Sequence, residues 1–154
     1  MMTARKKIGI LTFHTPINYG AVLQTFALQN TVKKLYPDAD VKVINFKTQQ
    51  HIESYSIMKR KHSNLIKNII LQFFAILRYP ALRRRQTRFY RFVEENLSLT
   101  NRYKQEYDFL SKPPLMDIYI SGSDQVFNTE YAHSKVYYLG FEKLGSRKIA
   151  YAPS

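Results

Sequence analysis

The first 46 residues show a pattern of strand, helix and strand. A short apolar run predicts a buried strand at Lys6–Phe13, and apolar residues at helical spacing predict a helix from Gly20 to Tyr36. Pro37 ends that helix, and the alternating segment Asp40–Phe46 predicts a second strand. The residues expected on the apolar stripe of the helix are Val22, Leu23, Phe26, Ala27 and Leu35. Strands joined by a helical crossover pair in parallel, so we expect an α/β fold.

The remaining sequence predicts further helices and strands around the same sheet. We expect helices at Asn64–Leu77, at Pro80–Leu97 with Pro80 in the first turn, and around Tyr103–Leu110. We expect strands at Asp117–Ser121, Val136–Phe141 and Lys148–Ala152. An open α/β sheet needs cover beyond its last strand, and the chain stops at Ser154. We therefore expect residues 1–154 to be one domain of a protein that is cut off.

The composition favours a folded protein of a reducing compartment. Hydrophobic residues make up 45% of the chain, which is enough for a sizeable core, and cysteine is absent. The apolar run Ile8–Phe13 is too short for a secretory signal, and Leu65–Leu77 is too short and too polar to span a membrane. We therefore expect a cytoplasmic protein.

A first group of polar and small residues follows the first predicted strand. The segment Phe13–Gln24, the first motif, joins that strand to the N-terminus of the following helix, where open α/β sheets bind ligands. The candidate binding residues are Asn18, Tyr19, Gly20 and Gln24. Helix amides and the Asn18 and Tyr19 side chains can bind a sugar or a phosphate. The structural alternative is that Asn18 caps the helix, Gly20 relieves crowding and Tyr19 packs. A dinucleotide-binding glycine pattern is absent.

A second group follows the predicted strand at Asp117–Ser121. The segment Ile120–Asn128, the second motif, combines a glycine with side chains that can bind hydroxyls or phosphate oxygens. The candidate binding residues are Gly122, Ser123, Asp124, Gln125 and Asn128. The structural alternative is an Asx-type turn or a helix cap, with Asp124 bonded to nearby amides.

Together, these segments resemble the polysaccharide pyruvyl transferase family. The sequence N-Y-G-A-V-L-Q, continuing to Gln29, is similar to the family's opening, and G-S-D-Q-V-F-N stands where the family has G-S-D-Q-V-W-N. Phe127 thus replaces a usual tryptophan. The aromatic segment Tyr137–Phe141 and the segment Lys148–Ser154 follow in the family's order. The four motifs span nearly the whole chain.

The resemblance implies an architecture and a reaction. Family members resemble GT-B glycosyltransferases, with two Rossmann-like halves and an active site between them, and this chain covers the N-terminal half. They transfer the pyruvyl group of phosphoenolpyruvate, the donor substrate, onto a sugar as a ketal and release phosphate, without a further cofactor. The resemblance assigns the catalytic groups mainly to the C-terminal half, so it names no catalytic residue here. His14 and Asp124 are the titratable side chains of the two motifs, and His14 can equally be a solvent-facing loop residue.

The same resemblance implies the partners of the chain. We expect a glycan or a lipid-linked oligosaccharide as acceptor, and a separate C-terminal half without which this chain is inactive. A cytoplasmic enzyme with a lipid-linked acceptor can lie peripherally on the inner face of the cytoplasmic membrane.

Positive charge is concentrated in one segment, which we expect to be a helical insertion at about residues 47–104. This segment holds 13 Lys and Arg against 3 Asp and Glu, or +10 of the net +13. Helical spacing places Arg84, Arg88 and Arg91 on one face, the arginine face. The residues roughly opposite are Leu82, Phe89, Phe92 and Val93. The arginine face suits an anionic membrane surface or a partner helix, and it also suits plain solvation.

A second function class remains open beside the transferase. The chain can be a non-catalytic module that binds anions or a membrane surface, which would need no C-terminal half. Metal binding is not expected, because His51, His62 and His133 are scattered and lack ligand spacing. Nucleic-acid binding is not expected either, because no motif accompanies the charge.

Overall fold

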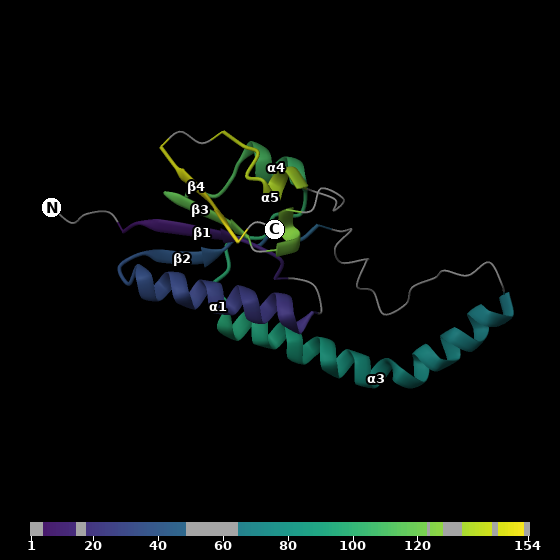
Figure 1. Cartoon of the computed structure of the whole chain (residues 1–154). Coiled ribbons are helices and arrows are strands. Elements are labelled where there is room, and N and C mark those ends of the chain that lie inside the picture. Colours follow the sequence, from purple (N-terminus) through teal and green to yellow (C-terminus); the bar gives the residue numbers. More distant parts are fainter. Residues whose placement is uncertain are drawn as a thin grey trace.

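A computed structural model describes residues 5–14, 18–48, 65–122, 124–127, 134–142 and 145–152, with the backbone alone at 65–77, 124–125 and 134. Four parallel strands form one sheet in the order β2-β1-β3-β4 (Figure 1). The strands are β1 (Lys7–Leu11), β2 (Asp40–Val43), β3 (Ile118–Gly122) and β4 (Arg147–Tyr151). The predicted parallel α/β fold, a Rossmann-like arrangement, is confirmed.

Helices cover the two faces of the sheet. The long helices α1 (Tyr19–Leu35) and α3 (Leu65–Asn96) lie on one side in Figure 1. The shorter helices α4 (Glu106–Ser111) and α5 (Ser134–Tyr137) lie on the other, and the 3-10 turn η1 (Asp124–Phe127) contributes to the same core as they do. β4 is an edge strand, and most of its residues are exposed.

Each face of the sheet has its own hydrophobic core. The core under α1 and α3 contains Ile8, Ile10, Val22, Leu28, Val32, Ala39, Val41, Val43, Phe89, Val93, Leu97, Ile118 and Ile120. The core under α4 and α5 contains Leu11, Ile44, Phe46, Phe109, Met116, Tyr119, Val126, Val136, Tyr137, Leu139 and Phe141. Successive strand residues point to opposite faces, which is why Ile10 and its neighbour Leu11 belong to different cores.

The buried face of α1 differs from the predicted stripe. Val22 is buried and Phe26 half-buried, as expected, but Leu23 and Leu35 are 53% and 68% exposed, and Ala27 is exposed too. The residues that α1 buries are Val22, Thr25, Leu28, Gln29 and Val32. Two of these are polar, and their side chains bond to backbone atoms, which removes the cost of burying them. A prediction based on apolar residues alone therefore missed Thr25 and Gln29.

The predicted pair of helices at Asn64–Leu77 and Pro80–Leu97 is wrong, because one continuous helix contains Pro80 in its interior. A proline lacks one N–H donor and crowds the carbonyl four residues earlier, but it does not prevent the helix from continuing around it. Pro80 is exposed, so water can reach the local backbone. The C-terminal part of α3 packs beside α1, and its N-terminal part extends beyond α1 and away from the sheet (Figure 1).

The predicted strand at Val136–Phe141 is also wrong. This segment contains the end of α5 and a turn in which Leu139 has a φ of 54°. Its alternating side chains Tyr137, Leu139 and Phe141 are buried, but the free edge of β3 is occupied by β4. With that edge paired, the segment covers the face of the sheet instead of joining it.

Candidate functional site

The first and second motifs begin at the same edge of the sheet. β1 and β3 are parallel neighbours, and Leu11 pairs with Ser121 at their carboxyl ends. The first motif follows β1, and the second motif begins in the last three residues of β3 and continues beyond the strand. Both motifs therefore leave the sheet at the carboxyl ends of two neighbouring strands, which is where open α/β sheets bind ligands.

In the first motif, Asn18 caps α1. Its side-chain Oδ1 accepts a hydrogen bond from the backbone N–H of Gly20 at 2.9 Å. A Cβ at Gly20 would lie 3.3 Å from the same oxygen, so glycine keeps the cap uncrowded. These contacts confirm the capping role that the sequence offered as an alternative for Asn18. Gln24 lies one turn further along α1 with its side chain exposed.

Tyr19 connects the first motif to the basic helix α3. Its ring meets the Phe89 ring edge to face at a centroid distance of 5.9 Å, and the Arg85 guanidinium lies 5.2 Å from the Tyr19 centroid. Tyr19 as a whole nevertheless remains 54% exposed. The sequence treated the first motif and the basic helix as separate features, whereas the fold brings them into contact.

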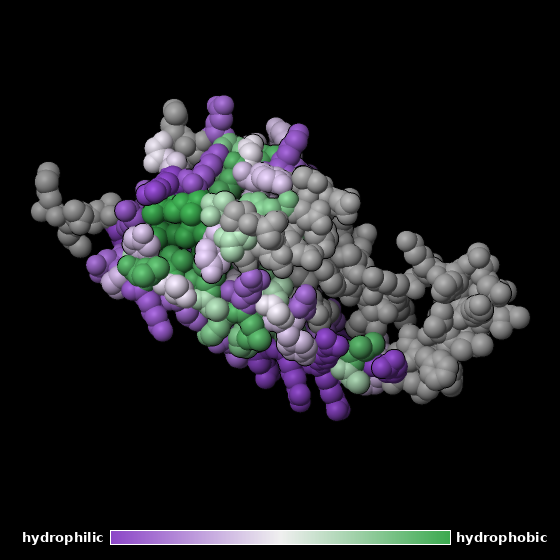
Figure 2. Space-filling view, viewed as in Figure 1, coloured by the Kyte–Doolittle hydropathy of each residue, from purple (hydrophilic) through white to green (hydrophobic). Residues whose placement is uncertain are grey.

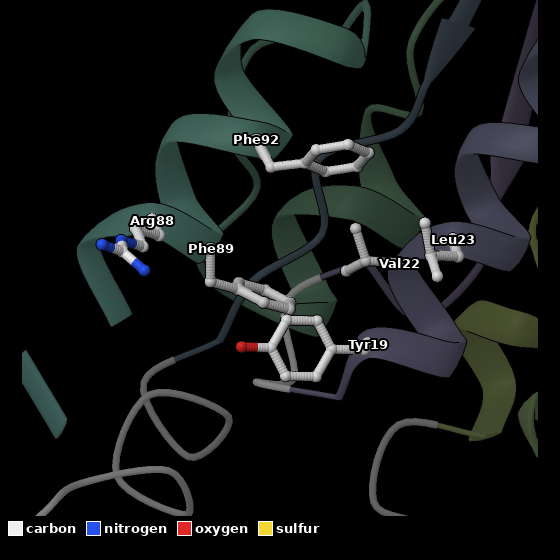
Figure 3. A pocket seen from close by; sticks show the side chains of 6 residues that line it. All are labelled: Tyr19, Val22, Leu23, Arg88, Phe89 and Phe92. Carbon is white, nitrogen blue, oxygen red and sulfur yellow. The ribbon is translucent and has the colours of Figure 1, made fainter. Parts of the chain in front are cut away.

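A pocket of about 260 Å³ opens between α1 and α3 at this contact (Figure 3). We call it the Tyr19 groove. It is lined by Tyr19, Val22, Leu23, Arg88, Phe89 and Phe92. Its walls are apolar except for Arg88 and the Tyr19 hydroxyl, which lie on the same side in Figure 3.

In the second motif, the backbone conformation and the close approach of β4 require a glycine at position 122. Its φ is +142°, and a Cβ there would lie 2.1 Å from the carbonyl oxygen of Tyr151 in β4. The close approach at Gly122 is therefore to the neighbouring strand. Ser123 and Asn128 lie outside the described residues. Asp124 and Gln125 belong to η1, of which only the backbone is described at these two positions.

The rest of η1 packs on the core under α4 and α5. Val126 is buried, and the Phe127 ring meets the Tyr138 ring edge to face at 5.9 Å. The Tyr138 hydroxyl donates to the Phe127 carbonyl oxygen at 2.6 Å. Phe127, the residue that departs from the family motif, thus fills an aromatic contact in the described structure.

His14 is buried, so it is not the solvent-facing residue that the sequence left open. Its Nδ1 lies 3.2 Å from the Thr12 carbonyl oxygen, and its Nε2 lies 3.2 Å from Asn45 Oδ1. Burial lowers the pKa of the imidazole, and the positive charge of Lys47 acts in the same direction. The two oxygens favour the protonated ring but do not outweigh burial. The sequence missed Asn45, whose position just after β2, at the same edge of the sheet, could have identified it.

The arginine face is exposed as predicted. Arg84, Arg88 and Arg91 are exposed, whereas Phe89 and Val93 of the same helix are buried. Figure 2 shows hydrophilic side chains projecting from the surface over α1 and α3. Arg88 has a second role that the helical wheel did not show, because it also lines the Tyr19 groove beside Phe89.

Within the described ranges, no three metal-ligating side chains lie close enough together to hold an ion. No helix in the described part of the chain is both long and apolar enough to cross a membrane.

Comparison with known proteins agrees with the motifs. A family model described as Polysaccharide pyruvyl transferase matches residues 18–154. No match was found among curated proteins, and none among solved structures. The matched region begins at Asn18, the cap of α1. It includes the second motif and the segments Tyr137–Phe141 and Lys148–Ser154. The chain therefore belongs to the polysaccharide pyruvyl transferase family.

Proposed function

We propose that this protein takes part in the transfer of a pyruvyl group from phosphoenolpyruvate to a sugar of a cell-surface glycan. The family match over residues 18–154 is the observation that carries the proposal. The adjacency of β1 and β3 supports it, because it directs both family motifs to one edge of the sheet.

The reaction makes clear demands on its site. A proton is added to the methylene carbon of phosphoenolpyruvate, two sugar hydroxyls bond to the central carbon, and the bond between that carbon and the phosphate oxygen breaks. Each hydroxyl loses its proton, and inorganic phosphate leaves. Such a site needs an acid, and it needs cations around the carboxylate and the phosphate.

We assign this chain the acceptor side of that site. Tyr19 and Gln24 are exposed near the N-terminus of α1, and Gly122 is the last residue of β3, where the second motif leaves the sheet. We propose that Tyr19 and Gln24, together with Asn18, Gly20, Ser123, Asp124, Gln125 and Asn128, contact sugar hydroxyls, and that Gly122 positions the second motif. The acid and most of the cations that hold phosphoenolpyruvate then come from a C-terminal half, and this chain alone is inactive.

The test measures phosphate release from phosphoenolpyruvate in the presence of a glycan acceptor, with mass spectrometry of the glycan to detect the ketal. The chain is assayed alone and mixed with the C-terminal half of a complete family member. We expect no release above background from the chain alone, and ketal formation in the mixture. Turnover by the chain alone would show that the catalytic groups lie in this half. A mixture that stays inactive, while the family member's own two halves are active together, would refute the acceptor-side assignment.

The arginine face favours a second function, association with the anionic inner face of the cytoplasmic membrane. Residues 78–91 contain six arginines and no acidic residue. None of the six forms an ion pair with an acidic side chain of the described residues. Such association suits a lipid-linked acceptor, and it also suits a binding module without catalysis.

A further inference from the structure

The Tyr19 groove is an apolar hollow on the surface of the protein. Phe89 and Val22 form a buried part of its lining, and Phe92 is half-buried. Tyr19 and Leu23 line it while more than half exposed, so a ligand can reach both side chains from solvent. Apolar side chains that are left exposed around a hollow of this kind typically mark a binding site.

A second hollow, which is basic, adjoins the Tyr19 groove. Its lining residues are Tyr19, Ala81, Arg84, Arg85 and Arg88, and its volume is about 330 Å³. It shares Tyr19 and Arg88 with the groove, so the apolar and the cationic hollow meet at these two side chains. Arg84 and Arg88 have no acidic partner among the described residues, and Arg85 lies over the Tyr19 ring.

The geometry points to a specific ligand: we propose that the two hollows together bind one molecule of a lipid phosphate. The alkyl chain lies in the Tyr19 groove against Phe89, Phe92 and Leu23. The phosphate lies in the basic hollow, where the guanidinium groups of Arg84, Arg85 and Arg88 can each donate to its oxygens. The ligand must therefore be both apolar and anionic, because the groove has few polar groups and the basic hollow no acidic lining residue.

This proposal deepens the proposed membrane association by naming a site for a single lipid. A flat arginine face would attract any anionic surface and would not distinguish the parts of a lipid. The two adjoining hollows should require both parts at once. The experiment therefore uses soluble ligands instead of vesicles, so its outcome does not depend on membrane association or on pyruvyl transfer.

The test is isothermal titration calorimetry of the chain with four soluble probes below their micelle concentrations: octyl phosphate, butyl phosphate, inorganic phosphate and octyl glucoside. Octyl phosphate should bind most tightly. Each buried methylene adds roughly fourfold to affinity, so butyl phosphate should bind at least about tenfold more weakly. Octyl glucoside, which has the same chain without charge, should also bind at least about tenfold more weakly.

Two variants with exposed positions test the lining. Leu23→Ser should weaken octyl phosphate binding several-fold, and Arg88→Gln should weaken it about tenfold, since it removes a charged hydrogen bond. Leu35→Ser is the matched control on the same helix, at a leucine that is 68% exposed outside the groove. Arg147→Gln is the control for charge, at an exposed arginine of β4. Both controls should bind like the unchanged protein.

Three results would overturn the proposal. Equal affinity for inorganic phosphate and octyl phosphate would indicate a site for a free anion. Equal affinity for octyl glucoside and octyl phosphate would indicate an apolar pocket without charge recognition. Unchanged binding by Leu23→Ser, with its circular dichroism melting curve also unchanged, would place the chain of the lipid elsewhere.

Discussion

Gly122 is the residue whose identity the structure explains most directly. Its φ of +142° is strained for any residue with a side chain, and the carbonyl oxygen of Tyr151 occupies the place of a Cβ. The residue therefore allows β3 and β4 to lie close together within the second motif.

Gly122→Ala should lower the free energy of unfolding by at least about 3 kcal/mol, because strain and a backbone clash add together. Urea denaturation measures the change. Gly145→Ala is the matched control, since Gly145 has a φ of +77° but open space around it. It should cost only about 1 kcal/mol. Equal losses for the two variants would mean that the contact with Tyr151 contributes nothing.

His14 should make stability depend on pH. Because burial lowers the pKa of this imidazole, the unfolded chain binds a proton at a higher pH than the folded chain does. The free energy of unfolding should therefore fall as the pH drops below about 6.5, the unperturbed pKa, towards the folded pKa. One such group contributes at most about 1.4 kcal/mol per pH unit.

His14→Asn should remove this contribution. Urea denaturation at about pH 7.5 and about pH 5.5 should show a smaller loss of stability on acidification in the variant than in the unchanged protein. Carboxylates titrate mainly below this range, so they affect both proteins alike. The same pH dependence in both proteins would contradict a lowered pKa for His14.

At the scale of the elements, Gln29 links α1 to the end of α3. Its side chain is fully buried, its Nε2 donates to the Asn96 carbonyl oxygen at 3.3 Å, and its Oε1 accepts from the Ser98 N–H at 2.8 Å. The Gln29 amide thus supplies hydrogen-bond partners for two backbone groups just after the end of α3. Beyond that point the chain runs beside the end of β2, where Leu99 pairs with Val43.

Gln29→Leu keeps the volume but should lower the free energy of unfolding by about 3 kcal/mol, because it leaves two backbone groups without partners. Thr31→Ala, at an exposed position of the same helix, should change it by less than about 0.5 kcal/mol. Urea denaturation compares them. A loss in Gln29→Leu no larger than that in Thr31→Ala would show that water replaces the amide.

Pro80 lies in the interior of α3. Pro80→Ala therefore restores an N–H inside the helix and should raise helical content by circular dichroism. It should also raise the free energy of unfolding by up to about 3 kcal/mol. Thr87→Ala, an exposed position of α3, should gain no more than about 0.7 kcal/mol. Loss of stability in Pro80→Ala would favour two helices with Pro80 at the start of the second.

At the scale of the whole molecule, charge and packing are separated on α3. Phe89 and Val93 complete the core under the sheet, while the arginine face points outward. Variants of the arginine face can therefore test membrane association without removing core contacts.

Replacing Arg84, Arg88 and Arg91 by glutamine should weaken pelleting with phosphatidylglycerol vesicles. Pelleting of the unchanged protein should fall steeply between about 50 and about 500 mM salt, because charges are screened beyond about 10 Å at 0.1 M. Phosphatidylcholine vesicles should bind both proteins poorly. Replacing Lys104, Lys112 and Arg147 by glutamine is the control, because it removes the same charge from exposed positions elsewhere. If both triple variants pellet like the unchanged protein, the arginine face is only solvated.

The parallel sheet and the family could both be predicted from the amino-acid sequence. Strand periodicity and the helical crossover predicted β1, α1 and β2 within a few residues, because these patterns reflect local geometry. The motifs predicted the family because each of them is a short, continuous stretch of the chain that can be recognised without the fold.

Which side chains meet depends on the packing of segments that are distant in the chain. Gln29 is buried because partners 67 and 69 residues away in the sequence satisfy its amide, and Val136–Phe141 is not a strand because β4 takes its place. Tyr19 and Arg85 are 66 residues apart in the sequence numbering, and His14 and Asn45 meet across two strand ends. Local sequence patterns do not predict these contacts, because contacts between distant residues depend on how the helices pack on the sheet.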